Sequence, residues 1–165
     1  MKIPPPNSYK QEVVASHKDD YSVLIETGTY YGDMCRAQMD NFDTIYSIEL
    51  GEYLYFQVQR IFMDYRHVKL YQGDSPTVLQ QIIPTLTEPV LFWLDAHWSG
   101  GKTVLGDKPC PLLEELDVIL ASPFKHGILI DDARCFGVLN KFPTMEETGD
   151  KLGEFTVKND IIWRI

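Results

Sequence analysis

Apolar residues along this chain follow two alternating patterns. Short apolar runs typical of β-strands occupy residues 23–26, 44–49, 67–71, 90–94 and 127–130. Segments with apolar positions at helical spacing lie between them, at residues 33–42, 52–65, 75–83 and 111–120. Strands that alternate with helices predict an α/β fold built on a parallel sheet.

The two ends of the chain add further elements. A helix is expected over residues 8–18, after a proline-rich, extended lead-in. Thr144 and Glu147 have the spacing of a capping box and predict the start of a short helix. Residues 154–158 and 161–165 predict two strands joined by a tight turn, so the sheet should end in an antiparallel hairpin.

Composition limits the class of protein and its partners. The chain has 165 residues, 44% of them hydrophobic, and no linker or repeat, so we expect one domain over residues 1–165. Its net charge of −9 argues against nucleic acid as a partner. No apolar run has the length of a membrane span, and no signal-peptide core is evident. Three widely spaced cysteines fit neither a disulfide framework nor a zinc pattern, which favours a reducing, cytoplasmic setting.

The loop after the first strand has the composition of a cofactor-binding turn. Its candidate binding residues are Glu26, Thr27, Gly28, Thr29 and Gly32. Glycines let a ligand approach the backbone, and the next helix offers free N–H groups, although ordinary turns share this composition. The second strand ends in an acid, Glu49, about 20 positions after the glycines. A carboxylate there can accept hydrogen bonds from ribose hydroxyls, which favours a cofactor site.

Asp74 and Ser75 follow the third strand. Open α/β sheets bind ligands at the carboxyl ends of their strands, which makes both residues candidates for cofactor contacts. Ser75 also has the position of a helix N-cap, with Pro76 at the first helical position. An ordinary turn aspartate is the alternative for Asp74.

The loop after the fourth strand begins with Asp95 and His97 and allows two interpretations. Gly101-Lys102-Thr103 looks like the end of a phosphate-binding loop. Such a loop must run directly into a helix, and the glycine and prolines that follow oppose one. The other interpretation is an active-site loop that follows a strand-end aspartate, with its helix delayed until residue 111.

The fifth strand ends in a pair of acids, Asp131 and Asp132. Neighbouring central strands would bring them to the same sheet edge as Asp95. Crowded carboxylates repel one another unless a cation neutralises them, and carboxylate oxygens suit Mg²⁺. The sequence therefore predicts a metal site of Asp95, Asp131 and Asp132. The alternative is that one aspartate caps a turn and another pairs with Arg134 or Lys102.

The segment from Glu26 to Gly32 resembles the first motif of class I S-adenosylmethionine-dependent methyltransferases, and the resemblance extends over residues 21–165. It implies a doubly wound, Rossmann-like and mainly parallel sheet that ends in an antiparallel hairpin. It further implies that Gly28 and Gly32 admit the methionine part of S-adenosylmethionine, that Glu49 holds the ribose, and that the adenine lies between Asp74 and Ser75.

Within that superfamily, the three aspartates are similar to the metal ligands of the macrocin O-methyltransferase group. That group has a second acid as proposed general base where this chain has His97, and neutral imidazole can accept a hydroxyl proton near pH 7. The resemblance implies Mg²⁺-assisted methylation of a small hydroxylated acceptor, with Asp95 and His97 as catalytic residues. The chain is shorter than these relatives, which allows an open site or a lid from another subunit of a homo-oligomer. A cofactor-binding module without turnover and a phosphate-loop enzyme are the alternatives.

Overall fold

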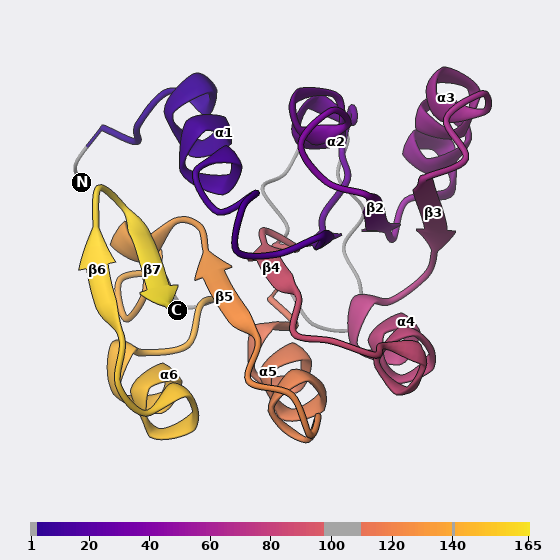
Figure 1. Ribbon diagram of the computed structural model, residues 1–165. Helices are drawn as coiled ribbons and strands as arrows, with labels where there is room; N and C mark the ends of the chain where they lie inside the picture. Colours follow the sequence, from indigo (N-terminus) through magenta and orange to yellow (C-terminus); the bar gives the residue numbers. More distant parts are fainter. Residues whose placement is uncertain (1–2, 98–109, 140) are drawn as a thin grey trace.

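A seven-stranded sheet forms the centre of the computed structural model, which describes residues 3–97, 110–139 and 141–165 (Figure 1). The strand order is β3-β2-β1-β4-β5-β7-β6. The parallel strands are β1 (Val23–Thr27), β2 (Thr44–Glu49), β3 (Val68–Gln72), β4 (Leu91–Leu94) and β5 (Gly127–Ile130). The antiparallel hairpin consists of β6 (Thr156–Lys158) and β7 (Ile161–Arg164), with β7 beside β5. This confirms the predicted α/β class and the terminal hairpin.

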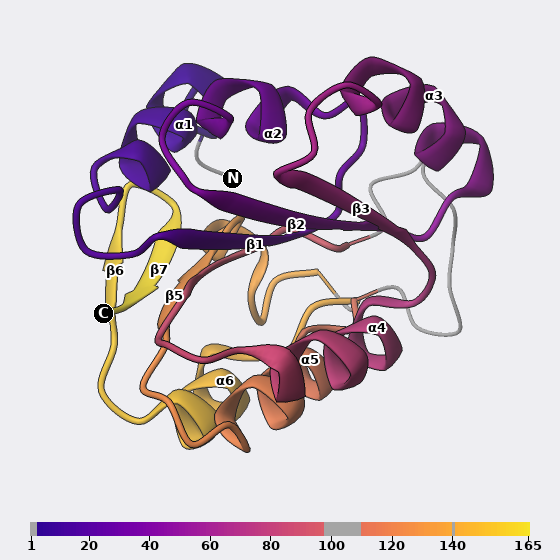
Figure 2. The same ribbon diagram turned by 45° about the vertical axis from the view of Figure 1, so that its right-hand side comes forward.

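Helices cover both faces of the sheet (Figures 1 and 2). One face carries α1 (Asn7–Ala15), α2 (Asp33–Gln38) and α3 (Glu52–Phe62), and the other carries α4 (Ser75–Ile82), α5 (Leu112–Leu120) and α6 (Met145–Leu152). Two short 3₁₀ turns, η1 (Ile83–Thr85) and η2 (Ala133–Cys135), complete the described elements. None of the helices in the described ranges is long and apolar enough to cross a membrane.

Alternation along the strands separates two hydrophobic cores. In β4, Leu91 and Trp93 face the core under α1 to α3, while Phe92 and Leu94 face the core under α4 to α6. Both faces of a central parallel strand are covered, which explains why this run is apolar throughout. The two layers therefore hold the sheet from both sides and fix the positions of the strand ends.

Helix boundaries differ from the predicted ones at several ends. α2 ends at Gln38, although the apolar pattern extends to Phe42, because Phe42 enters the core from the turn that leads to β2. Asp74, not Ser75, is the N-cap residue of α4, and Ser75 is its first helical residue. Apolar spacing reports burial, and a residue just beyond a helix can be buried as well.

A buried histidine joins the starts of β4 and β5. His126 is 3% exposed, its Nδ1 accepts a hydrogen bond from the Val90 N–H at 3.1 Å, and its Nε2 lies 2.8 Å from the Ser122 hydroxyl. Burial, with a smaller contribution from Arg164, lowers the pKa of His126 to about 4. The ring is therefore neutral in the folded protein at neutral pH.

We expect protonation of His126 to make the stability of the protein depend on pH. Between its ordinary pKa of 6.5 and the folded value of about 4, the unfolded chain binds the proton first, so this contribution to stability falls as pH drops through that window. In His126→Asn the amide oxygen can still accept from Val90, but nothing titrates. Urea unfolding at pH 7, 5.5 and 4.5 should show a flatter pH dependence for the variant; equal slopes for both proteins would contradict the assignment.

Candidate functional site

The loops that follow β1 and β4 touch at a glycine. Gly28 has a φ of +88°, and a Cβ added there would lie 2.6 Å from the carbonyl oxygen of Asp95. The Gly28 N–H donates to the Ile48 carbonyl at 2.9 Å, which also ties the loop to the end of β2. Only a residue without a side chain permits this close approach. The ends of three neighbouring strands are thus drawn together around Gly28.

Glu26 lies inside the protein below this loop. Its Oε2 accepts hydrogen bonds from Ser47 at 2.5 Å and from the Cys35 thiol at 3.1 Å, and the residue is 2% exposed. Burial raises the pKa of Glu26 to about 7, against the opposing effect of these hydrogen bonds. Glu26 also borders a cavity of about 90 Å³ with Gly28 and Asp95.

The other residues predicted in this loop are buried or packed against other parts of the protein. Thr27 and Thr29 are buried, and the Thr29 hydroxyl lies 2.6 Å from the Ser47 hydroxyl. Gly32 has a φ of +77°, and a Cβ there would lie 2.8 Å from the Phe62 ring of α3. The structure thus gives Gly32 a packing reason to be glycine, whether or not a ligand approaches it.

Glu49 at the end of β2 holds the loop after β1. Its two carboxylate oxygens accept hydrogen bonds from the N–H groups of Tyr30 and Gly51, each at 2.8 Å. Tyr30 has a φ of +49°, a conformation that this hydrogen bond helps to hold. Burial raises the pKa of Glu49, against the effect of the two N–H donors. The carboxylate therefore joins the end of β2 to the loop after β1, and its role toward a ribose stays a prediction.

Asp74 and Ser75 lie at the end of β3 but face different surroundings. Asp74 is exposed, and its carboxylate accepts from the Thr77 hydroxyl at 3.0 Å. Ser75 is buried and donates to Glu115 of α5, which is 1% exposed and whose pKa burial raises to about 7. Glu115 was not predicted from the sequence, although its place between Leu112 and Leu116 on the buried face of α5 is a signal of its burial.

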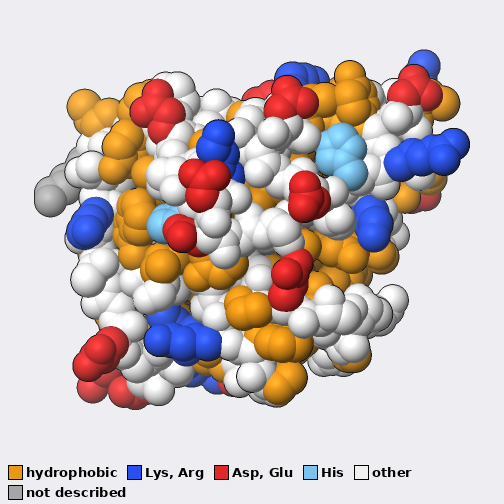
Figure 3. Space-filling model, in the orientation of Figure 1, with side chains coloured by type: hydrophobic (Ala, Val, Ile, Leu, Met, Phe, Trp, Pro, Cys, Tyr) orange, Lys and Arg blue, Asp and Glu red, His pale blue; other side chains and the backbone are white. Residues whose placement is uncertain are grey.

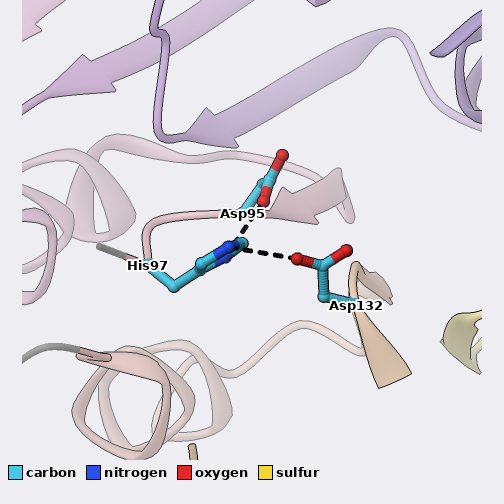
Figure 4. A group of neighbouring side chains, drawn as sticks. All are labelled: Asp95, His97 and Asp132. Atoms are coloured by element: carbon cyan, nitrogen blue, oxygen red, sulfur yellow. Dashed lines mark ion pairs between the residues drawn. The ribbon is translucent and has the colours of Figure 1, made fainter. Parts of the chain in front are cut away.

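His97 lies between two of the predicted aspartates (Figure 4). Its Nδ1 is 3.2 Å from Asp95 Oδ1, and its Nε2 is 3.0 Å from Asp132 Oδ2. Burial alone would lower the pKa of His97, but the carboxylates of Asp132 and Asp95 outweigh it and raise the pKa to about 9. In turn, burial would raise the pKa of Asp132, but His97 and Arg134 lower it to about 2.

Asp131, the third predicted metal ligand, has a different partner. Its carboxylate forms an ion pair with Lys10 of α1 and accepts the Asp132 N–H at 2.7 Å. Burial, reinforced by Asp95, raises its pKa to about 7 despite Lys10. Asp132 has a φ of +59°, in the left-handed region. Within the described residues, Asp95 groups with His97 and Asp132, whereas Asp131 groups with Asp132 and Asp160.

Cationic side chains of the protein contact most of the aspartates in this acidic group. Arg134 lies 2.6 Å from Asp132 and also pairs with Asp160, as the alternative interpretation of the sequence allowed for Arg134. Lys10 and Asp160 were not predicted, because each lies far along the chain from the acids that it accompanies. The phosphate-loop candidate, Gly101-Lys102-Thr103, lies outside the described residues.

Solved structures of methyltransferases share this fold. An S-adenosylhomocysteine-bound methyltransferase of Podospora anserina, PaMTH1, is 15% identical over 94% of this chain and 78% of its own, with a TM-score of 0.67. The S-adenosylhomocysteine complex of a Bacillus cereus O-methyltransferase is 14% identical over 98% of this chain and 80% of its own, with a TM-score of 0.65.

A third example is TomG of Streptomyces achromogenes, an O-methyltransferase of tomaymycin synthesis solved with S-adenosylmethionine. It is 13% identical over 98% of this chain and 79% of its own, with a TM-score of 0.64. No family model matches the sequence, and no curated protein matches it. At such low identities the likeness shows the fold alone, which is the class I methyltransferase fold.

The free-energy cost of the steric contact at Gly28 can be measured separately from the cost of its left-handed backbone conformation. Gly153 also has a positive φ, +73°, but a Cβ there would meet nothing within 4 Å. We expect Gly153→Ala to report backbone strain alone, about 1–3 kcal/mol, and Gly28→Ala to cost at least about 1 kcal/mol more. Urea unfolding measures both. Equal losses would mean that the loop after β4 yields to the added methyl group.

The pairing of His97 should be visible in solution. A folded pKa raised from 6.5 to about 9 means that its ion pairs contribute fully below pH 6.5 and are lost as pH rises through 9. An NMR titration of the His97 ring should give a midpoint near 9, and Asp132→Asn should lower it by at least about one unit, since one carboxylate is removed. A wild-type midpoint below 7 would show that the ring does not pair as described.

Proposed function

We propose that this protein is an S-adenosylmethionine-dependent methyltransferase. The observation that carries the proposal is the contact at Gly28, where the loop after β1 meets the Asp95 backbone. Glu49, at the end of β2, accepts a hydrogen bond from the Tyr30 N–H of the same loop. Methyltransferases with this fold have been solved with S-adenosylmethionine or S-adenosylhomocysteine bound. The same sheet supports other activities, so the proposal rests on this site and not on the fold.

The strand ends would provide a contact for each part of the cofactor. Gly28 and the buried carboxyl group of Glu26 border the cavity that we propose for the methionine portion. Glu49 would accept hydrogen bonds from the ribose hydroxyls, since each carboxylate oxygen has capacity beyond its one N–H donor. Asp74 and Ser75 would flank the adenine at the end of β3.

The acceptor that we propose is the hydroxyl group of a small molecule. S-adenosylmethionine would supply the methyl group: the acceptor oxygen would bond to the methyl carbon as the sulfonium sulfur leaves, and the hydroxyl proton would pass to a base. Positioning and exclusion of water are the main contributions that such a transfer needs from the protein. On the face drawn in Figure 3, the basic side chains of the described residues are scattered between acidic, hydrophobic and other side chains, which does not favour a nucleic-acid acceptor.

His97 is the base that we propose, held by Asp95 and Asp132. Its raised pKa keeps the ring protonated near pH 7, so it must release its own proton before it can take one from the acceptor. This role therefore favours alkaline conditions. While protonated, the same ring would stabilise negative charge that develops on the acceptor oxygen.

A divalent ion fits the donor chemistry of the site. Asp95, His97 and Asp132 have possible ligand atoms within 4.8 Å of one another, and Mg²⁺ prefers the carboxylate oxygens of Asp95 and Asp132, which would leave His97 as the base. Asp131, the remaining ligand predicted from the sequence, would have to leave Lys10 to join them. When bound, the ion would orient the acceptor hydroxyl and lower its pKa. Magnesium stays a prediction for this site.

Binding of S-adenosylhomocysteine tests the cofactor assignment directly. We expect micromolar binding by calorimetry, and at least about a tenfold weaker affinity for Glu49→Gln, because the amide offers one acceptor oxygen in place of two. Glu52→Gln is the matched control, since Glu52 is exposed on α3 a few residues away and should leave binding unchanged.

The same measurement separates the alternatives. Binding without methylation of any member of a panel of hydroxylated compounds would support a cofactor-binding module. Absence of S-adenosylhomocysteine binding together with ATP binding that Lys102→Ala abolishes would refute the methyltransferase and support the phosphate-loop enzyme.

A further inference from the structure

Helix α1 places a lysine in the acidic group at the carboxyl edge of the sheet. Lys10 forms an ion pair with Asp131, and its Nζ lies 3.8 Å from Asp132 Oδ1. The side chain of Lys10 is only 13% exposed, and that of Asp131 is 1% exposed. An isolated carboxylate at this depth would be very costly, and the ammonium group stabilises it through the ion pair.

The position of Lys10 is fixed by the rest of α1. Val13 and Val14 are buried in the core under α1 to α3. The backbone carbonyl of Gln11 accepts a hydrogen bond from Gln38 of α2 at 2.8 Å, and the Tyr9 hydroxyl accepts one from Asn159 in the β6–β7 turn at 2.7 Å. The helix is therefore anchored on both sides of Lys10, and the ion pair is not a chance contact of a mobile surface side chain.

Each carboxylate of this acidic group is paired with a cationic side chain of the protein. His97 lies between Asp95 and Asp132, Arg134 pairs with Asp132 and Asp160, and Lys10 pairs with Asp131. A divalent ion that used Asp131 as a ligand would need the same carboxylate oxygens that hold the ammonium group. Two cations cannot both occupy them without strong repulsion.

We infer that Lys10 is a positioning residue that competes with a divalent ion for Asp131. With the ammonium group in place, Asp131 is closed as a metal ligand, and the acidic group is stable without an ion. Lys10 and Gln11 also line the cavity that contains Gly28 and Asp95, so displacement of Lys10 would change the pocket proposed for the cofactor. This last consequence rests on the proposed function; the competition itself does not.

Titration of the protein with Mn²⁺, followed by calorimetry, tests the competition. Lys10→Met keeps the apolar stem but removes the charge, and we expect it to bind Mn²⁺ at least about tenfold more tightly than the wild type. Lys10→Arg keeps the charge and should bind as weakly as the wild type. Lys18→Met, at an exposed position after α1, removes one positive charge elsewhere and should also match the wild type.

Several outcomes would overturn the inference. Equal or weaker Mn²⁺ binding by Lys10→Met, with circular dichroism and thermal unfolding that show a folded protein, would mean that the ammonium group does not block the site. If Lys10→Met does not fold, Mn²⁺ binding by the wild-type protein still tests the inference. Micromolar binding by the wild type, weakened in Asp131→Asn, would show that Asp131 can bind metal while Lys10 is present. S-adenosylhomocysteine titrations of the same proteins keep the two hypotheses apart, because a failure there refutes the methyltransferase and leaves the Mn²⁺ comparison valid.

Discussion

Charge balance among buried and half-buried carboxylates is the constraint on which the carboxyl edge of this sheet depends. Asp95, Asp131, Asp132 and Asp160 come from three separate segments, and each is close to a histidine, lysine or arginine of the protein. Uncompensated, such charges would be protonated or would force the strand ends apart. The pairs therefore determine where α1, the loop after β4 and the 3₁₀ turn η2 can lie.

The second constraint is steric and acts at Gly28. Contact between the loop after β1 and the Asp95 backbone brings the two central strand ends together, and a side chain at this position would separate them. Hydrogen bonds from the N–H groups of Tyr30 and Gly51 to the Glu49 carboxylate then fix the loop from the side of β2. Charge pairs thus shape this sheet edge at the ends of β4 and β5, and the contacts of Gly28 and Glu49 shape it at the ends of β1 and β2.

The sequence was sufficient to predict the sheet and most of its strand ends. Parallel strands present their carboxyl ends at one edge, so Glu49, Asp74 and Asp95 could be placed there from hydrophobic patterns alone. The partner of Asp131 could not be predicted, because Lys10 lies 121 positions away and helical spacing carries no information on such a contact. The left-handed backbone at Asp132 could not be predicted either, since an aspartate adopts this conformation only in a suitable tertiary setting.

Helix ends were less predictable than helices, since Phe42 continues the apolar pattern of α2 from a turn. At the far margin of the sheet, β6 has only three residues, all of them exposed, and ends in Lys158. A strand so short, with a charged side chain at its end, offers few unpaired backbone groups for another chain to extend. The hairpin that completes the fold therefore also limits intermolecular sheet growth at this side, a protection against aggregation.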